Sequence, residues 1–157
     1  MNDFLNNEGP KPIKFKKGQV LYVEGEPSNY VYLIKSGIVK LIKEDAGRLV
    51  AIARLKDKEF IGLESFFSDS SRKESAVAVE ETNAFMIKRN DLKGAMKTCP
   101  EWMNDLISLM SGRLENTMDI LRAHRISDDL EQGFGFGQDE EVKIKKSLEE
   151  YKKKKGL

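Results

Sequence analysis

The strongest constraint on this chain is a series of short apolar segments between Phe15 and Ile87, separated by turns that contain glycine. Alternation of apolar and polar residues over about four to eight positions favours half-buried β-strands. The segments expected as strands are 20–23, 30–34, 38–42, 49–53, 76–79 and 84–87. The Ser36-Gly37 pair is typical of a tight hairpin turn. The pattern predicts a mainly β fold, an antiparallel β-roll of the double-stranded β-helix or jelly-roll type, with flanking helices.

The apolar spacing changes to a helical period after Lys88. Asn90 or Asp91 can cap a short helix that continues to about Thr98. Pro100 suits the first turn of a second helix, because its missing N–H would have no partner there in any case. The sequence therefore predicts two consecutive helices after the strands.

The second helix is expected to be the longest element, from Glu101 to Arg125. Its apolar residues recur every three or four positions and are Met103, Leu106, Met110, Leu114, Met118 and Leu121. A helix of about 25 residues is roughly 37 Å long, which is more than a small roll can cover. We therefore expect its second half to pack against another copy in a homodimer. Trp102 is expected to anchor the start of the helix in the core.

These patterns divide the chain of 157 residues into four parts. They are an N-terminal extension (1–12), the β-roll with its short helix (13–98), the long dimerisation-type helix (99–126), and a flexible Gly/Phe linker with a lysine-rich amphipathic tail (127–157). Phe134 and Phe136 lie between glycines and are expected either to dock on the chain's own roll, with the nucleotide pocket as acceptor, or to bind a protein partner. The apolar residues of the tail are Val142, Ile144, Leu148 and Tyr151.

Composition limits the choice of partners. The chain has 27 basic and 26 acidic residues and a net charge of +1, so no strong overall field attracts it to nucleic acid or to an anionic membrane. Cys99 is the only cysteine, which excludes an intrachain disulfide and a cysteine-based zinc cluster. The sequence has neither a secretory leader pattern nor about 18 consecutive apolar residues. We expect a cytoplasmic protein without membrane contact.

Three glycine-marked stretches carry a family resemblance. They are Phe15-Lys16-Lys17-Gly18-Gln19-Val20-Leu21, Glu24-Gly25-Glu26-Pro27-Ser28, and the segment 32–40 (YLIKSGIVK), and Phe60-Ile61-Gly62 follows them. In this order and spacing they resemble the cyclic-nucleotide-binding domain of the catabolite activator and FNR type of regulator, over about residues 13–125. The resemblance implies the β-roll, a phosphate-binding cassette that begins at Gly62, and the long dimer helix. Residues 126–157 show no two-helix pattern with a recognition helix, so we expect no DNA-binding domain.

The cassette departs from the family pattern at two positions. In that pattern a Gly-Glu pair binds the ribose, and an arginine before a small pair such as Ser-Ala binds the cyclic phosphate. Leu63 stands at the glutamate position, with Glu64 one place later, and Glu74 stands at the arginine position. At an effective dielectric near 20, a carboxylate about 4 Å from a phosphate costs about 4 kcal/mol. The residues that do match are Gly62, Ser75 and Ala76.

Three functional hypotheses follow. In the first, ordinary cyclic mononucleotides bind weakly or not at all, and the chain is a signalling adaptor that acts through protein–protein interaction. In the second, a shifted cassette binds cAMP, cGMP or a cyclic dinucleotide; its residues would be Gly62, Glu64, Ser65, Arg72, Lys73, Ser75 and Ala76. In the third, the basic tail 152–155 binds nucleic acid. A segment 72–74 that is merely solvated and mutually paired is the alternative to any ligand site.

No catalytic site is expected. His124 is the only histidine and lies near the end of the long helix, where it complements the helix dipole. A metal site of the kind found in β-barrel enzymes needs several histidines and a carboxylate. The chain also lacks the hydrolase, phosphate-loop and zinc-protease motifs. The sequence therefore predicts a non-enzyme without metal or cofactor, apart from a cyclic nucleotide ligand in the second hypothesis.

Overall fold

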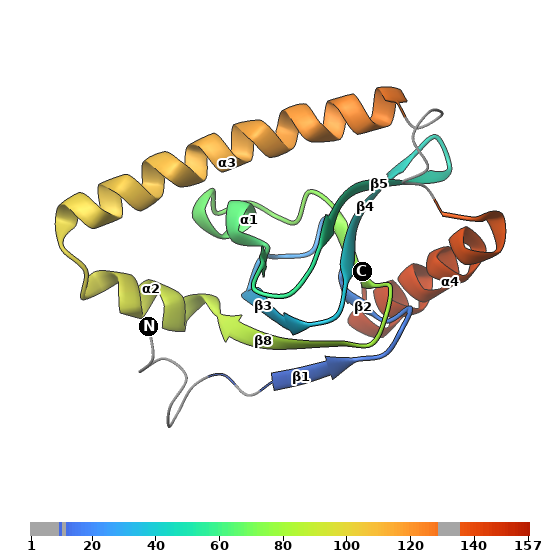
Figure 1. Cartoon of the computed structure of the whole chain (residues 1–157), viewed down its shortest axis with the longest axis horizontal. Coiled ribbons are helices and arrows are strands. Elements are labelled where there is room, and N and C mark those ends of the chain that lie inside the picture. The colour runs from blue at the N-terminus through green and yellow to red at the C-terminus, as the bar shows by residue number, and fades with distance from the viewer. Residues whose placement is uncertain (1–9, 11, 129–135) are drawn as a thin grey trace.

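The fold is built from two four-stranded antiparallel sheets. A computed structural model describes residue 10, residues 12–128 and residues 136–157 (Figure 1). The first sheet has the order β1 (Pro12–Phe15), β8 (Thr82–Lys88), β3 (Tyr30–Ser36), β6 (Phe60–Ile61). The second has the order β2 (Val20–Tyr22), β7 (Ser75–Ala78), β4 (Val39–Asp45), β5 (Arg48–Leu55). The predicted antiparallel β-roll is confirmed, and β1 and β6 are strands that the alternation did not mark.

Apolar side chains of both sheets form the core. Along β4 and β5, alternate residues point inward, as the period of two requires; they are Val39, Leu41, Val50 and Ile52. Tyr32 links the sheets, because its ring packs edge-on against Phe15 at 6.1 Å and stacks on Tyr22 at 6.2 Å. Completely buried residues such as Val39, Ile61 and Ala76 belong to the same core.

Gly37 does not form the predicted hairpin. The strands before and after it, β3 and β4, belong to different sheets, so the chain crosses from one sheet to the other at this point. A Cβ at Gly37 would lie 2.5 Å from the carbonyl oxygen of Glu81 and 2.6 Å from the Cα of Thr82. The glycine is needed for this close approach of two backbones. The hairpin of this region is instead Ala46-Gly47, which joins β4 to β5 with Asp45 opposite Arg48.

Four helices flank the roll: α1 (Leu63–Phe67), α2 (Arg89–Lys97), α3 (Glu101–Asp128) and α4 (Gln138–Lys155). The predicted cap at Asn90 or Asp91 is wrong. The N-cap position is Lys88, without a side-chain cap, because β8 continues directly into α2. Helix α3 runs along the roll above α1, and α4 lies at the opposite side against the second sheet (Figure 1). None of the described helices is long and apolar enough to cross a bilayer.

The predicted apolar stripe of α3 is divided between two environments. Met118 and Leu121 pack against the core, although we expected them beyond the reach of the roll. The part that projects from the roll is the first half of the helix, where the exposed apolar residues are Trp102, Leu106, Leu109, Met110 and Leu114. The direction of the chain after α2 explains this reversal, because α3 starts away from the roll and reaches it only in its later turns (Figure 1).

Trp102 is not a core anchor, since 63% of its surface is exposed. It lies in the first turn of α3, directly after the α2–α3 connection, and this end of the helix extends away from both sheets (Figure 1). Burial of a tryptophan requires a neighbouring element, and the roll is too far away to supply one. Trp102 therefore belongs to the exposed apolar face of α3.

The tail forms a helix that covers the second sheet on the face opposite the core. Ile144 and Leu148 are buried against an apolar cluster formed by Val20, Val23, Ile42, Leu49 and Val77. Tyr151 packs on the same cluster, whereas Val142 points away and is 67% exposed. Phe134 lies outside the described residues. Phe136 packs on this cluster, with the amine of Lys40 4.6 Å from its ring centroid, so it does not occupy the nucleotide pocket.

Candidate functional site

The cassette begins with a left-handed turn at Gly62. This residue has φ of 86° between β6 and the first turn of α1. A Cβ added there would lie 2.0 Å from Nη1 of Arg72. Glycine is therefore required both by the backbone conformation and by the arginine side chain that lies on it.

Arg72 enters the cassette and is only 4% exposed. Its Nη1 donates to the Ser65 hydroxyl at 3.0 Å and to the Gly62 carbonyl at 3.4 Å, and its Nη2 donates to the Tyr30 carbonyl. The guanidinium carbon lies 4.0 Å from the centroid of the Tyr22 ring, a cation–π contact. The guanidinium is therefore held beside the glycine turn by groups of the chain itself. The alternative of a solvated 72–74 loop is wrong for this residue.

Glu74 is also buried, at 1% exposure, and is paired with an arginine of α3. Nε of Arg122 donates to Oε2 of Glu74 at 2.6 Å, and Nη2 of Arg122 lies 3.6 Å from Oε1 of Glu64. Nη1 of the same arginine donates to Asp119 at 2.7 Å. Arg122 therefore lies beside both cassette carboxylates, with its single positive charge bonded directly to Glu74, and fixes α3 to the cassette.

The two carboxylates are close enough to affect each other's titration. Burial, followed by the neighbouring Glu74 carboxylate, raises the pKa of Glu64 to about 7, while the positive charge of Arg122 acts in the opposite direction. Near neutral pH, Glu64 is thus close to the midpoint of its titration. A ribose hydroxyl would meet a carboxyl that is already engaged with Glu74 and Arg122.

Lys73 points away from the cassette. Its amine donates to Glu115 at 2.9 Å and to Asp119 at 3.2 Å, both on α3, and the bond to Glu115 is the main cause of the raised pKa of Lys73. Arg72 and Lys73 are neighbours in the chain, but the Arg72 side chain lies on the Gly62 turn whereas that of Lys73 bonds to α3. Of the two cations predicted to reach a phosphate, only Arg72 lies in the cassette.

The small residues of the cassette are already hydrogen-bonded. The Ser65 hydroxyl shares a hydrogen bond of 2.9 Å with that of Ser28, and the Ser75 hydroxyl accepts from the N–H of Glu24 at 3.0 Å. Ala76 is completely buried in β7. Gly62, Glu64, Ser65, Arg72, Ser75 and Ala76 are thus all buried in or beside the cassette region, and Lys73 is the one predicted residue that points elsewhere.

Sequence reasoning missed Arg122, Tyr22 and Ser28. Arg122 lies within the predicted long helix, but nothing in the helical period marks it as the partner of a carboxylate. Tyr22 falls in a predicted strand as an ordinary core residue. Its hydroxyl and Nε of Arg72 are buried without a hydrogen-bond partner in the described part of the chain. Burial raises the pKa of Tyr22 well above its ordinary value.

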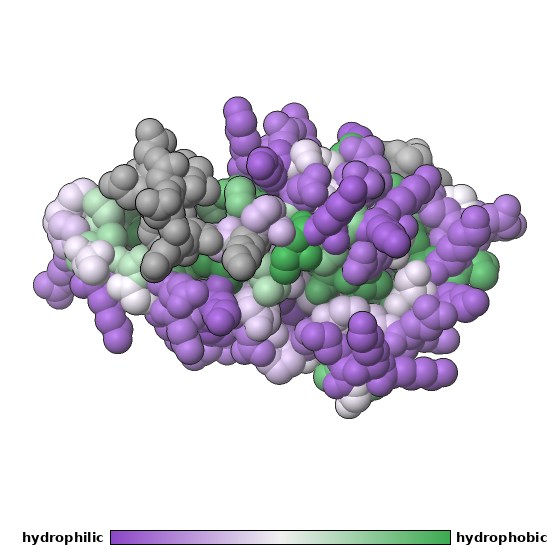
Figure 2. Space-filling model, turned by 90° about the horizontal axis from the view of Figure 1, so that it is seen from below, coloured by the Kyte–Doolittle hydropathy of each residue, from purple (hydrophilic) through white to green (hydrophobic). Residues whose placement is uncertain are grey.

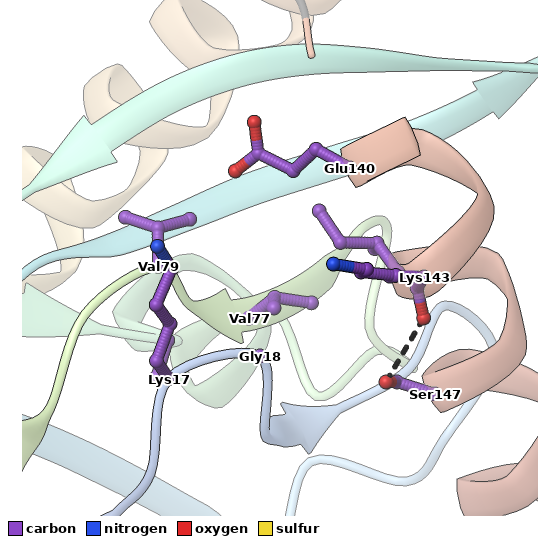
Figure 3. A pocket seen from close by; sticks show the side chains of 9 residues that line it. Lys17, Gly18, Val77, Val79, Glu140, Lys143 and Ser147 are labelled. Carbon is purple, nitrogen blue, oxygen red and sulfur yellow. Dashed lines mark hydrogen bonds between the residues drawn. The ribbon is translucent and has the colours of Figure 1, made fainter. Parts of the chain in front are cut away.

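A separate groove lies between α4 and the turn before β2 (Figure 3). Its volume is about 490 Å³, and Lys17, Val77 and Lys143 contribute to its walls. Ser147 on α4 borders it and donates to the carbonyl of Lys143 (Figure 3). Figure 2, seen from the side of β1, shows polar side chains over most of that face with apolar surface between them. The groove shares no lining residue with the cassette.

Fold and cassette together define a cyclic-nucleotide-binding domain, and the family model described as "Cyclic nucleotide-binding domain" matches residues 12–99. The chain belongs to this family. It is 29% identical over 108 residues to the CRP-like cAMP-activated global transcriptional regulator of Mycobacterium tuberculosis, covering 68% of this chain and 48% of the relative. It is 29% identical over 101 residues to the cyclic AMP receptor protein of Thermus thermophilus, covering 64% and 47%. The chain thus spans about half the length of the curated relatives it matches.

Solved structures agree with this assignment. The catabolite activator protein of Thermus thermophilus superposes with a TM-score of 0.60 at 26% identity, over 73% of this chain and 54% of the other. The cAMP-bound form of the EAL enzyme Bd1971 gives the same TM-score at 18% identity, over 72% and 31%, which is a likeness of fold alone. The family match ends at residue 99, so all of α3 and all of α4 lie beyond it.

Proposed function

We propose that this chain is a non-catalytic regulatory module whose cassette does not bind cAMP or cGMP and which acts through protein contacts. The observation that carries the proposal is the ion pair between Glu74, at the position of the family's phosphate arginine, and Arg122 of α3. A negative group stands where the family places its positive one. The carboxylate is buried and engaged, so it cannot rotate into solvent to admit a phosphate.

The position of Arg72 supports the same conclusion. A phosphate approaching the Gly62 turn would have to displace a guanidinium that is bonded to Ser65, Gly62 and Tyr30. Hydrogen bonds from Arg72 to the phosphate would replace hydrogen bonds that Arg72 already makes, so the net gain in binding free energy would be small. Glu74 would also repel the phosphate: an unpaired carboxylate about 4 Å away would cost about 4 kcal/mol, or roughly three decades in affinity, and the ion pair with Arg122 reduces this cost.

The exposed face of α3 supports action through protein contacts. Trp102, Leu109 and Met110 are each more than half exposed, and neighbouring Leu106 is 46% exposed. Contiguous apolar surface of this kind is typical of interaction sites. We propose that a second copy of the chain covers it, giving a homodimer through the first half of α3.

Isothermal titration calorimetry with cAMP and cGMP tests the cassette directly. The unmodified chain should show no binding up to about 1 mM ligand. The double variant Glu74→Arg/Arg122→Glu keeps a reversed ion pair and restores arginine at the family position, so it should gain measurable affinity. Glu44→Arg/Arg113→Glu, at exposed residues of β4 and α3, makes the same two substitutions outside the cassette and is the control. Submicromolar affinity of the unmodified chain would contradict the proposal.

A second candidate function is the sensing of a different anion. Arg72 is a buried cation beside a glycine turn, and its Nε has no hydrogen-bond partner in the described residues. Thermal shift with cyclic di-GMP distinguishes this function, because a ligand that binds the native state raises the melting temperature. A shift that Arg72→Ala abolishes would support it.

A further inference from the structure

We infer that α4 is an intramolecular latch that holds Arg72 in the closed cassette, and that release of α4 opens the cassette. The inference rests on the proposed function, since it concerns the regulation of the same site. It is carried by a chain of contacts from Tyr151 through Glu26 to Arg72. Helix α4 lies beyond the residues that match the family model, so this connection joins the matched domain to a segment outside it.

The first link is the Tyr151 hydroxyl. It donates a shared hydrogen bond to Oε1 of Glu26 at 3.0 Å and to the carbonyl of Leu21 at 3.2 Å. Burial, followed by the Glu26 carboxylate, raises the pKa of Tyr151, so the hydroxyl keeps its proton and remains a donor. One side chain of α4 thus contacts two separate segments of the roll.

Both of these segments position Arg72. The carbonyl of Glu26 accepts from the N–H of Arg72 at 2.9 Å, and the N–H of Gly25 donates to the carbonyl of Arg72 at 2.8 Å. Leu21 precedes Tyr22, and the guanidinium carbon of Arg72 lies 4.0 Å from the centroid of the Tyr22 ring. Tyr151 therefore holds the loop that fixes the Arg72 backbone and the strand that supports its side chain.

The contacts of α4 with the second sheet are few enough for the helix to undock and dock again. Only Ile144 and Leu148 are buried side chains of this helix, and the remaining anchors are polar or partly exposed. Near its first turn, Glu141 accepts from the N–H of Leu49 at 2.9 Å, and Lys145 donates to the carbonyl of Gly47. A helix that buries so little apolar surface opens at lower free energy than the strands of the core.

The coupling between α4 docking and the state of the cassette must act in both directions. If undocked α4 favours an open cassette, any ligand that draws Arg72 away from Tyr22 favours undocked α4 by the same factor. The apolar cluster around Val20 and Val77 would then be exposed, so the event in the cassette would change a surface on the other face of the sheet. This gives the module an output without a change of oligomeric state.

Hydrogen exchange measured by NMR tests the latch without any ligand. The reporters are the amides of Arg72 and Gly25, which lie in the bonds described above. Leu148→Asp should undock α4, and Tyr151→Phe should remove only the hydroxyl. We expect exchange of both reporters to rise about tenfold or more in Leu148→Asp, the change given by loss of one net hydrogen bond, and by a smaller factor in Tyr151→Phe. Val142→Asp, on the exposed side of the same helix, should leave exchange unchanged.

The controls separate the outcomes. Fast exchange of the α4 amides in Leu148→Asp shows that the helix has undocked. If the Arg72 and Gly25 amides then keep their original exchange rates, the latch is refuted. If Leu148→Asp does not fold, Tyr151→Phe decides, and unchanged reporter exchange in it also refutes the latch. Neither result depends on nucleotide binding, so failure here leaves the calorimetric test of the proposed function unaffected.

Discussion

Arg122 donates from Nε to Oε2 of Glu74 across 2.6 Å, between residues that are both less than one-tenth exposed. The bond joins the last residue before β7 to the second half of α3. It places the only buried arginine described on α3 against the carboxylate that the sequence predicts at the family's arginine position. We therefore expect the stability of the fold and the docking of α3 to depend on the same contact.

Removal of the Arg122 charge should strongly destabilise the fold. Arg122→Met leaves Glu74 and Glu64 buried without a counter-charge, so the free energy of unfolding should fall by about 3–5 kcal/mol in urea denaturation. Arg113→Met, at an exposed position of the same helix, should change it little. The double variant Arg122→Met/Glu74→Met should recover much of the loss, because an apolar pair replaces the ions. A loss below 1 kcal/mol, as for a surface ion pair, would contradict the burial argument.

Stability should decrease between about pH 4.5 and 7 because of Glu64. Its pKa is about 7 in the fold against an ordinary 4.5, so the folded state binds more protons within this window. Glu64 thereby adds on the order of 1–3 kcal/mol to the free energy of unfolding. This stabilisation is complete below pH 4.5 and is lost as the pH rises through about 7. Glu64→Gln should flatten this part of the curve, measured by urea denaturation across the window. Exposed Glu44→Gln is the control, and an unchanged slope in Glu64→Gln would reject the assignment.

Gly37 should tolerate alanine less well than Gly47. Both have positive φ, at 102° and 77°, so alanine at either site costs about 1–2 kcal/mol in backbone strain. At Gly37 the new Cβ would also lie 2.5 Å from backbone at Glu81, whereas at Gly47 nothing lies within 4 Å. Melting temperatures of the two variants give the comparison. Equal losses would show that the crossing between the sheets does not need the close approach.

Self-association should depend on the first half of α3. Leu109→Glu places a charge in the exposed apolar face and should give a monomer in light scattering, with an unchanged melting temperature of the folded unit. Asn116→Glu, also exposed on α3, adds the same charge at a polar position and should leave the dimer intact. Leu121 is unsuitable for this test, because it packs on the core and its replacement by glutamate would damage the fold. A monomeric unmodified chain at about 100 μM would contradict the dimer.

The sequence by itself determined six of the eight described strands and the family, and it predicted the unusual cassette. Strand alternation and glycine turns are local properties, so they can be recognised without the fold. The position of Glu74 could be found in the same way, because the cassette is a continuous segment whose spacing is fixed by the chain. The same spacing predicts that two of its key positions differ from the family pattern.

Only the tertiary structure decided how these segments meet. Gly37 was expected in a hairpin and instead lies at a crossing, because its close neighbours are Glu81 and Thr82, far along the chain. Arg122 and Glu74 are 48 residues apart, and no periodicity reports which residue of a helix will face a given carboxylate. The position of α4 on the second sheet depends on an apolar cluster drawn from four strands. Contacts of this kind depend on the packing of whole elements, which leaves no local pattern in the sequence.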